Sequence, residues 1–136
     1  MKYKTCISIA ENSPKKIKNK LKESFKKSDY VEVRLDFLKT KDVPEALESI
    51  KKDLKKVVCT LRPQNEGGKF TGSEKERIAI LKLIAEYNPF LLDVEFGRRP
   101  TRVLHKRRLR KLWFGRRASA RTPWCSRGLS PPASRN

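Results

Sequence analysis

Charged side chains alternate with apolar ones in two segments of the chain, and these charged residues are the clearest candidates for a chemical role. Glu32, Arg34 and Asp36 occupy every second position of one segment, and Asp93 and Glu95 do so in another. If each segment is a strand, its charged side chains share one face of a sheet, where they need partners or a ligand. Two interpretations follow: an open sheet whose polar face meets water, or a polar barrel interior that holds a polar ligand at the carboxyl ends of its strands.

A third segment ends in a loop that also carries charge. Arg62 lies where the strand pattern runs out, and Pro63 cannot donate a ladder hydrogen bond. The adjacent glycines at 67–68 allow backbone geometry that other residues resist, but they do not form a phosphate-binding G-x-G-x-x-G motif. A solvated connection is the usual interpretation of such a loop. Arg62 and Glu66 nevertheless leave the sheet at the same end as Arg34, which favours a shared site.

Strand and helix patterns alternate along the first part of the chain. Apolar runs and period-two patterns predict strands at 3–10, 31–36, 56–61 and 92–96. Helices are predicted between them, because apolar residues recur every three or four positions after capping residues. The helical stripes are Ile17, Leu21 and Phe25; then Leu47, Ile50 and Leu54; and finally Ile80, Leu83, Ile84 and Tyr87 after a Ser73–Glu76 capping box.

These elements predict an α/β fold that forms the first half of a (β/α)₈ barrel. Connections of this length accommodate helical crossovers, which join parallel strands with right-handed packing. The chain has 136 residues, too few for a complete barrel of typically ~250 residues. A half barrel leaves its first and fourth strands with unpaired edges, which favours self-association.

The composition changes near Phe96 and Gly97. Residues 1–96 contain 18 Lys, 3 Arg and all 15 acidic residues, whereas residues 97–136 contain 11 Arg, 2 Lys and no acidic residue. We therefore divide the chain into a partial barrel at 1–96 and a basic tail at 97–136, which we expect to be disordered.

Several classes of protein are excluded by the sequence pattern. No window has the run of apolar residues that a membrane span needs, and the N-terminus lacks the apolar core of a secretory signal, so we expect a cytoplasmic protein. Cys6, Cys59 and Cys125 are widely separated and form no C-x-x-C pair. Neither a disulfide framework nor a zinc site is expected, and the thiols should be buried or inert.

Three motifs in this order resemble type I 3-dehydroquinate dehydratase, a Schiff-base-forming barrel enzyme of the shikimate pathway. They are Val-Glu-Val-Arg-Leu-Asp at 31–36, Thr-Leu-Arg at 60–62 with Glu-Gly-Gly at 66–68, and Leu-Asp-Val-Glu-Phe at 92–96. The resemblance implies dehydration of 3-dehydroquinate to 3-dehydroshikimate, a homodimer, and no metal or organic cofactor. In that family a lysine forms an iminium with the substrate ketone and a histidine moves the protons.

The resemblance also implies roles for individual residues of this chain. Glu66 looks like the carboxylate that orients the catalytic histidine, while Asp93 and Glu95 look like the polar interior of the fourth strand. Four residues look like substrate contacts, the first of them by position alone: Ser8, Glu32, Arg34 and Arg62.

The resemblance ends at Phe96, so the two central catalytic residues are not assigned. His105 lies in an arginine cluster without the family's flanking residues. Lys106 and Lys111 have no apolar strand around them that would desolvate an ammonium group and lower its pKa. We therefore expect this chain to be inactive by itself.

The basic tail has a composition typical of a GC-rich message read out of frame, and we interpret it as a frameshifted or spliced-in end. The alternative is a nucleic-acid-binding extension at 98–121, with arginines that neutralise phosphates and interleaved aromatic residues that stack on bases. A basic amphipathic helix on an anionic membrane is a further alternative. Either way, we expect the tail to bind polyanions without sequence preference. The aromatic residues are Trp113, Phe114 and Trp124, and the apolar positions of such a helix are Leu104, Leu109, Leu112 and Trp113.

Overall fold

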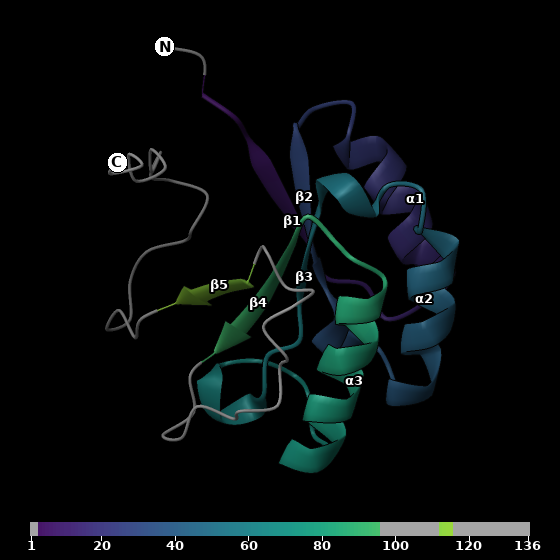
Figure 1. The fold of residues 1–136 in the computed structure, drawn as a ribbon. Coiled ribbons are helices and arrows are strands. Elements are labelled where there is room, and N and C mark those ends of the chain that lie inside the picture. Colours follow the sequence, from purple (N-terminus) through teal and green to yellow (C-terminus); the bar gives the residue numbers. More distant parts are fainter. Residues whose placement is uncertain (1–2, 96–111, 116–136) are drawn as a thin grey trace, which may run out of the picture.

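The computed structural model describes residues 3–95 and 112–115, which form a parallel sheet with helices on one side (Figure 1). The strands pair in chain order, each parallel to the next. The predicted α/β class and the four parallel strands are confirmed. In chain order the main elements are β1 (Cys6–Ile9), α1 (Pro14–Ser24), β2 (Tyr30–Arg34), α2 (Val43–Ser49), β3 (Val57–Thr60), α3 (Glu74–Glu86) and β4 (Leu91–Glu95).

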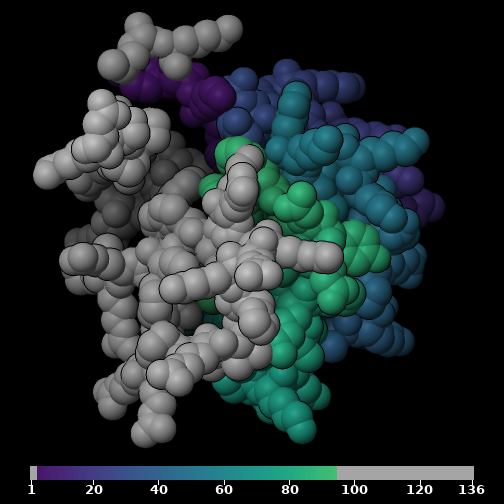
Figure 2. All heavy atoms as spheres, in the orientation of Figure 1, coloured from purple at the N-terminus to yellow at the C-terminus, as the bar shows by residue number. Residues whose placement is uncertain are grey.

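Alternating burial gives the sheet two different faces. Side chains such as Val33, Cys59 and Leu92 point toward the helices and are fully or almost fully buried. Their neighbours along each strand point to the opposite face, as the period of two requires. The helical stripes predicted from sequence complete this core, with Ile17, Leu21, Leu47, Ile50, Leu54, Ile80 and Ile84 buried, and Phe25, Leu83 and Tyr87 packed against it half-buried. In Figure 2 the blue, teal and green atoms form one continuous surface on the right of the molecule.

The helices begin where their capping residues predict. The Ser13 hydroxyl accepts from the backbone N–H of Lys16 at the start of α1, and Pro14 follows as the first helical residue. At α3 the capping box is complete, because Ser73 accepts from the Glu76 N–H while the Glu76 carboxylate accepts from the Ser73 N–H.

Two predicted elements are shorter than the sequence pattern indicated. The second helix ends at Ser49, and Leu54 enters the core from a separate 3₁₀ turn, η3 (Leu54–Lys56). The second strand ends at Arg34, because the chain turns there into η1 (Leu35–Phe37), which buries Leu35 completely. Asp36 therefore lies in a turn and not on the strand face where period two placed it. Two further 3₁₀ turns are η2 (Thr40–Asp42) and η4 (Gln64–Glu66).

A fifth strand, which the sequence pattern did not indicate, comes from the basic tail. β5 (Leu112–Gly115) pairs parallel to β4, with Asp93 opposite Trp113 in the register. The expectation that the fourth strand has an unpaired edge is therefore wrong. The rest of the tail, including His105, Lys106 and Lys111, lies outside the described residues. Within the described residues no helix has the length and apolar character needed to cross a membrane.

Candidate functional site

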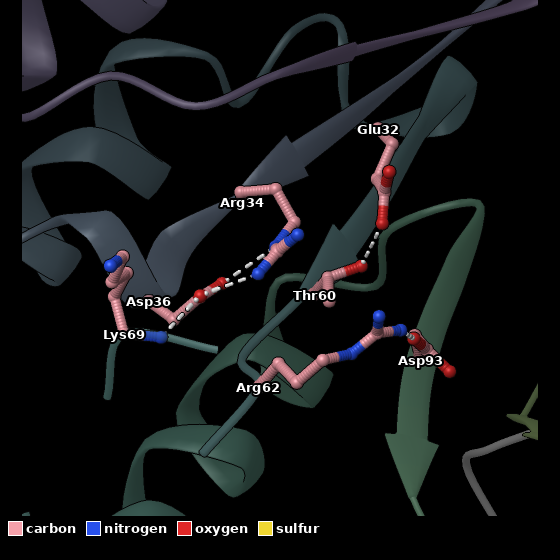
Figure 3. A network of polar contacts seen from close by, with 7 residues as sticks. All are labelled: Glu32, Arg34, Asp36, Thr60, Arg62, Lys69 and Asp93. Atoms are coloured by element: carbon pink, nitrogen blue, oxygen red, sulfur yellow. Dashed lines mark hydrogen bonds and ion pairs between the residues drawn. The ribbon is translucent and has the colours of Figure 1, made fainter. Parts of the chain in front are cut away.

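Polar side chains gather on the sheet face that points away from the helices. The register places Ser8 beside Glu32, Arg34 beside Thr60, and Thr60 beside Asp93. Four successive strands thus contribute one polar residue or more to a single surface, and Figure 3 shows most of them turned toward one another. The prediction of a shared face is confirmed for Glu32, Arg34 and Asp93, whereas Asp36 lies in η1.

Arg34 is held by Asp36 in a two-point ion pair at the end of β2. The Nε and Nη2 atoms of Arg34 donate to the two carboxylate oxygens of Asp36 at 2.9 and 2.8 Å. The hydrogen bond to Asp36 raises the pKa of the Arg34 guanidinium against the effect of burial, and the charges of Glu32 and Asp93 raise it further. Arg34 is therefore a permanent cation, and the carboxylates of Asp36, Glu32 and Asp93 stabilise its charge.

Arg62 and Asp93 form the second ion pair of this face. Arg62 Nη2 donates to Asp93 Oδ2 at 2.9 Å, which links the end of β3 to β4. Burial raises the pKa of the Asp93 carboxyl above its ordinary value, and the nearby Glu32 charge adds to this, although the hydrogen bond from Arg62 opposes it. Asp93 is thus a carboxyl group that takes up a proton more readily than an exposed aspartate.

Glu32 has a hydrogen-bond partner that the sequence did not reveal. The Thr60 hydroxyl, almost completely buried, donates to Glu32 Oε1 at 2.7 Å. This bond fixes one carboxylate oxygen and leaves the other to accept from a ligand. Ser8 is exposed on the same face, next to Glu32 across the β1–β2 pair.

The loop after β3 turns back on itself and places Glu66 in η4. Gly67 has a left-handed φ of 79°, which ends η4 and is costly for residues with a side chain. The backbone N–H groups of Gly68 and Phe70 donate to the carbonyls of Pro63 and Arg62 at 2.9 and 3.2 Å. Glu66 is half-buried in this turn.

Gly68→Ala should destabilise this loop more than a change at its neighbour. A methyl group at Gly68 would overlap the carbonyl oxygen of Arg62, a backbone atom that cannot move freely. We expect a loss of ~1–3 kcal/mol in the free energy of unfolding, typical of forced overpacking. Urea unfolding measures it, with Gly67→Asn as the matched control, since Asn tolerates a positive φ and the space around Gly67 is open. Equal losses in the two variants would contradict the steric explanation.

The lysines and cysteines are the other groups of the described residues that could act as nucleophiles. Every described lysine is exposed, and none lies in a strand. Burial raises the pKa of the Cys59 thiol to about 12, so this buried cysteine is unreactive as expected, while Cys6 is half-buried. No three His, Cys, Asp or Glu side chains in the described part are grouped so as to hold a metal ion.

A family model described as type I 3-dehydroquinase matches residues 5–111, most of the chain. The chain belongs to this family. The family predicted from the three motifs is therefore confirmed, and the match extends past the compositional break at Phe96. The 3-dehydroquinate dehydratase of Lactococcus lactis subsp. lactis is 41% identical over 76 residues, which are 53% of this chain and 33% of that protein. The enzyme of Methanopyrus kandleri is 39% identical over 72 residues, 49% of this chain and 34% of that protein.

Solved structures of the type I 3-dehydroquinase family agree with the fold. A type I 3-dehydroquinate dehydratase from Clostridium difficile superposes with a TM-score of 0.57 at 27% identity, covering 68% of this chain and 40% of that one. The enzyme from Geobacillus kaustophilus has a TM-score of 0.59 at 20% identity with the same coverage, which supports the fold. The chain thus spans about a third of the length of these curated relatives and 40% of these structures.

Proposed function

We propose that this chain supplies the substrate-binding half of a 3-dehydroquinate dehydratase, the enzyme that converts 3-dehydroquinate to 3-dehydroshikimate in the shikimate pathway. The observation that carries the proposal is the pair of guanidinium groups, Arg34 and Arg62, held beside Glu32 and Asp93 on one polar face. Family membership indicates which ligand such a face would bind.

The chemistry of this face matches a small polyhydroxylated carboxylate. Hydroxyl groups donate to carboxylates and accept from guanidinium groups, and a guanidinium can bind a carboxylate through two parallel hydrogen bonds. Asp36 engages two of the five N–H donors of Arg34, so the other three remain for a ligand or for Glu32. In the proposed complex Glu32, Arg34 and Arg62 bind the ring substituents, with Ser8 at the margin.

The described residues favour binding over turnover. A lysine that forms a Schiff base must lose its proton, which burial promotes by lowering its pKa, and every described lysine is exposed. We infer that Glu66, at the end of η4, is placed to orient a histidine. The lysine and the histidine themselves are not assigned to residues of this chain.

Arg62→Ala should weaken binding of 3-dehydroquinate by ~1.5–3 kcal/mol, because a hydrogen bond to a charged group is lost. Nitrogen-15 NMR titration of the full chain measures the dissociation constant from amide shifts around the polar face. Ser8→Ala is the control on the same face and should change the affinity much less, since Ser8 is exposed.

Two outcomes of this titration would contradict the proposal. An unchanged affinity in Arg62→Ala would remove that residue from the binding site. Shifts confined to residues outside the polar face, or no saturable shifts with the unmodified chain, would contradict substrate binding by this half of the barrel.

A further inference from the structure

Asp36 is the most buried charged side chain of the candidate site, and it binds two segments that are distant in the sequence. Its side chain is 0% exposed, while that of its partner Arg34 is 18% exposed. Besides the two hydrogen bonds from Arg34, Asp36 Oδ2 accepts from the backbone N–H of Lys69 at 3.0 Å. Figure 3 shows the carboxylate between the guanidinium and the Lys69 backbone.

Lys69 belongs to the loop at 63–72, which behaves as a unit because of its own hydrogen bonds. The residues on either side of the turn are bonded to each other, Gly68 to Pro63 and Phe70 to Arg62. The two ends also meet in a parallel bridge between Pro63 and Phe70. A bond to Lys69 therefore positions the whole turn, including η4, relative to the end of β2.

The Asp36 carboxylate also determines the orientation of the Arg34 guanidinium. A bidentate pair fixes the plane of a guanidinium more firmly than a single hydrogen bond does. The Phe37 ring, on the same 3₁₀ turn as Asp36, lies 5.4 Å from the guanidinium carbon and supports this orientation. The guanidinium that carries the remaining N–H donors also interacts electrostatically with the carboxylates of Glu32 and Asp93.

We propose that Asp36 is a positioning residue, which locks the Arg34 guanidinium and the loop at 63–72 into one arrangement and thereby sets the affinity of the polar face for its ligand. We call the contacts of Asp36 with Arg34 and with the Lys69 N–H the Asp36 latch. The effect on affinity rests on the proposed function, whereas the latch itself does not. Loss of the latch would leave Arg34 in place but free to rotate, and small misplacements of a binding group are costly.

The test compares Asp36→Asn with Glu74→Gln in the full chain. Asn keeps the size of Asp36 but offers one acceptor oxygen in place of two. Glu74 is the matched control because it also forms a two-point pair with an arginine, Arg77, at 2.8 and 2.7 Å, but on α3. Hydrogen exchange of the Lys69 amide and the Arg34 Nε–H reports the latch, and titration with 3-dehydroquinate reports the affinity.

We expect Asp36→Asn to accelerate exchange most at the Arg34 Nε–H, whose acceptor oxygen is replaced by an amide nitrogen, and less at the Lys69 amide, whose acceptor becomes a neutral oxygen. The variant should raise the dissociation constant about tenfold or more, while Glu74→Gln changes neither the exchange nor the affinity. Protected exchange at both groups in Asp36→Asn would overturn the latch. Accelerated exchange with unchanged affinity would overturn the positioning role. If the unmodified chain does not bind 3-dehydroquinate, the proposed function fails together with the effect on affinity, and the exchange rates still decide the latch.

Discussion

Arg34→Ala should lower the free energy of unfolding by ~3–5 kcal/mol at neutral pH, the typical cost of removing one partner from a buried ion pair. The reason is the carboxylate left behind. Asp36 is completely buried, and Arg34 provides two of its hydrogen bonds, so the variant must bury a charge that has lost most of its compensation. Chemical unfolding at constant salt measures the loss.

The dependence of this loss on pH separates the buried charge from simple loss of packing. In the unmodified chain burial alone would raise the pKa of Asp36, but hydrogen bonds from Arg34 and from the Lys69 N–H hold it below its ordinary value. Ionised Asp36 therefore stabilises the fold above the ordinary carboxyl pKa, and this contribution is lost as the pH falls through the lower folded pKa. In Arg34→Ala the effect of burial on the Asp36 pKa dominates. Protonation of this carboxyl at low pH therefore removes the cost of burying its charge.

We expect the stability difference between Arg34→Ala and the unmodified chain to shrink as the pH is lowered. The double variant Arg34→Met, Asp36→Leu should recover much of the loss at neutral pH, because apolar residues of similar volume can replace a buried pair. A loss that stays constant with pH, and that the double variant does not recover, would assign the effect to packing and not to the buried charge of Asp36.

The sequence predicted those parts of the fold that depend on local patterns. Period-two alternation identified the polar face of β2 and β4, and the Ser73–Glu76 spacing identified the start of α3, because each signal lies within a few residues. The alternation predicts that this strand ends at Asp36, but β2 ends two residues earlier, at Arg34. Asp36 continues the alternation of Glu32 and Arg34, and the burial of Leu35 that ends the strand depends on packing against the helices.

The hydrogen bonds of the candidate site were mostly beyond the reach of sequence patterns. Asp36 binds a backbone N–H that lies 33 residues away, and a backbone donor leaves no signature in the sequence. Thr60 binds Glu32 from the neighbouring strand, 28 residues away. The one signal for Thr60 in the sequence is its place in the Thr-Leu-Arg motif at 60–62, which does not indicate its partner. The family motifs named the charged residues, whereas the contacts that fix them required the fold.

The basic tail gives rise to the other prediction with a large effect. Residues 97–136 carry thirteen basic residues and no acidic one. We expect the full chain to bind DNA and RNA without sequence preference, because each phosphate contact releases counterions whatever the base. With six or more contacts, the affinity should fall roughly 10³- to 10⁵-fold between about 50 and 200 mM salt. Fluorescence anisotropy titrations with several ligands at a series of salt concentrations measure this decrease.

Two sets of matched charge-neutralising substitutions show whether the tail or the whole basic surface of the chain binds the nucleic acid. Changing Arg107, Arg108 and Arg110 to Gln should reduce the slope of log affinity against log salt by roughly 0.9 for each phosphate of duplex DNA that the variant no longer neutralises. Changing Lys15, Lys18 and Lys22 of α1 to Gln removes the same charge from exposed positions and should leave the slope nearly unchanged. Equal effects would contradict binding through the tail. A tail that evolved to bind a particular nucleic acid would instead prefer one ligand by ~4 kcal/mol or more at physiological salt. Such a preference would contradict the interpretation of the tail as an incidental polycation.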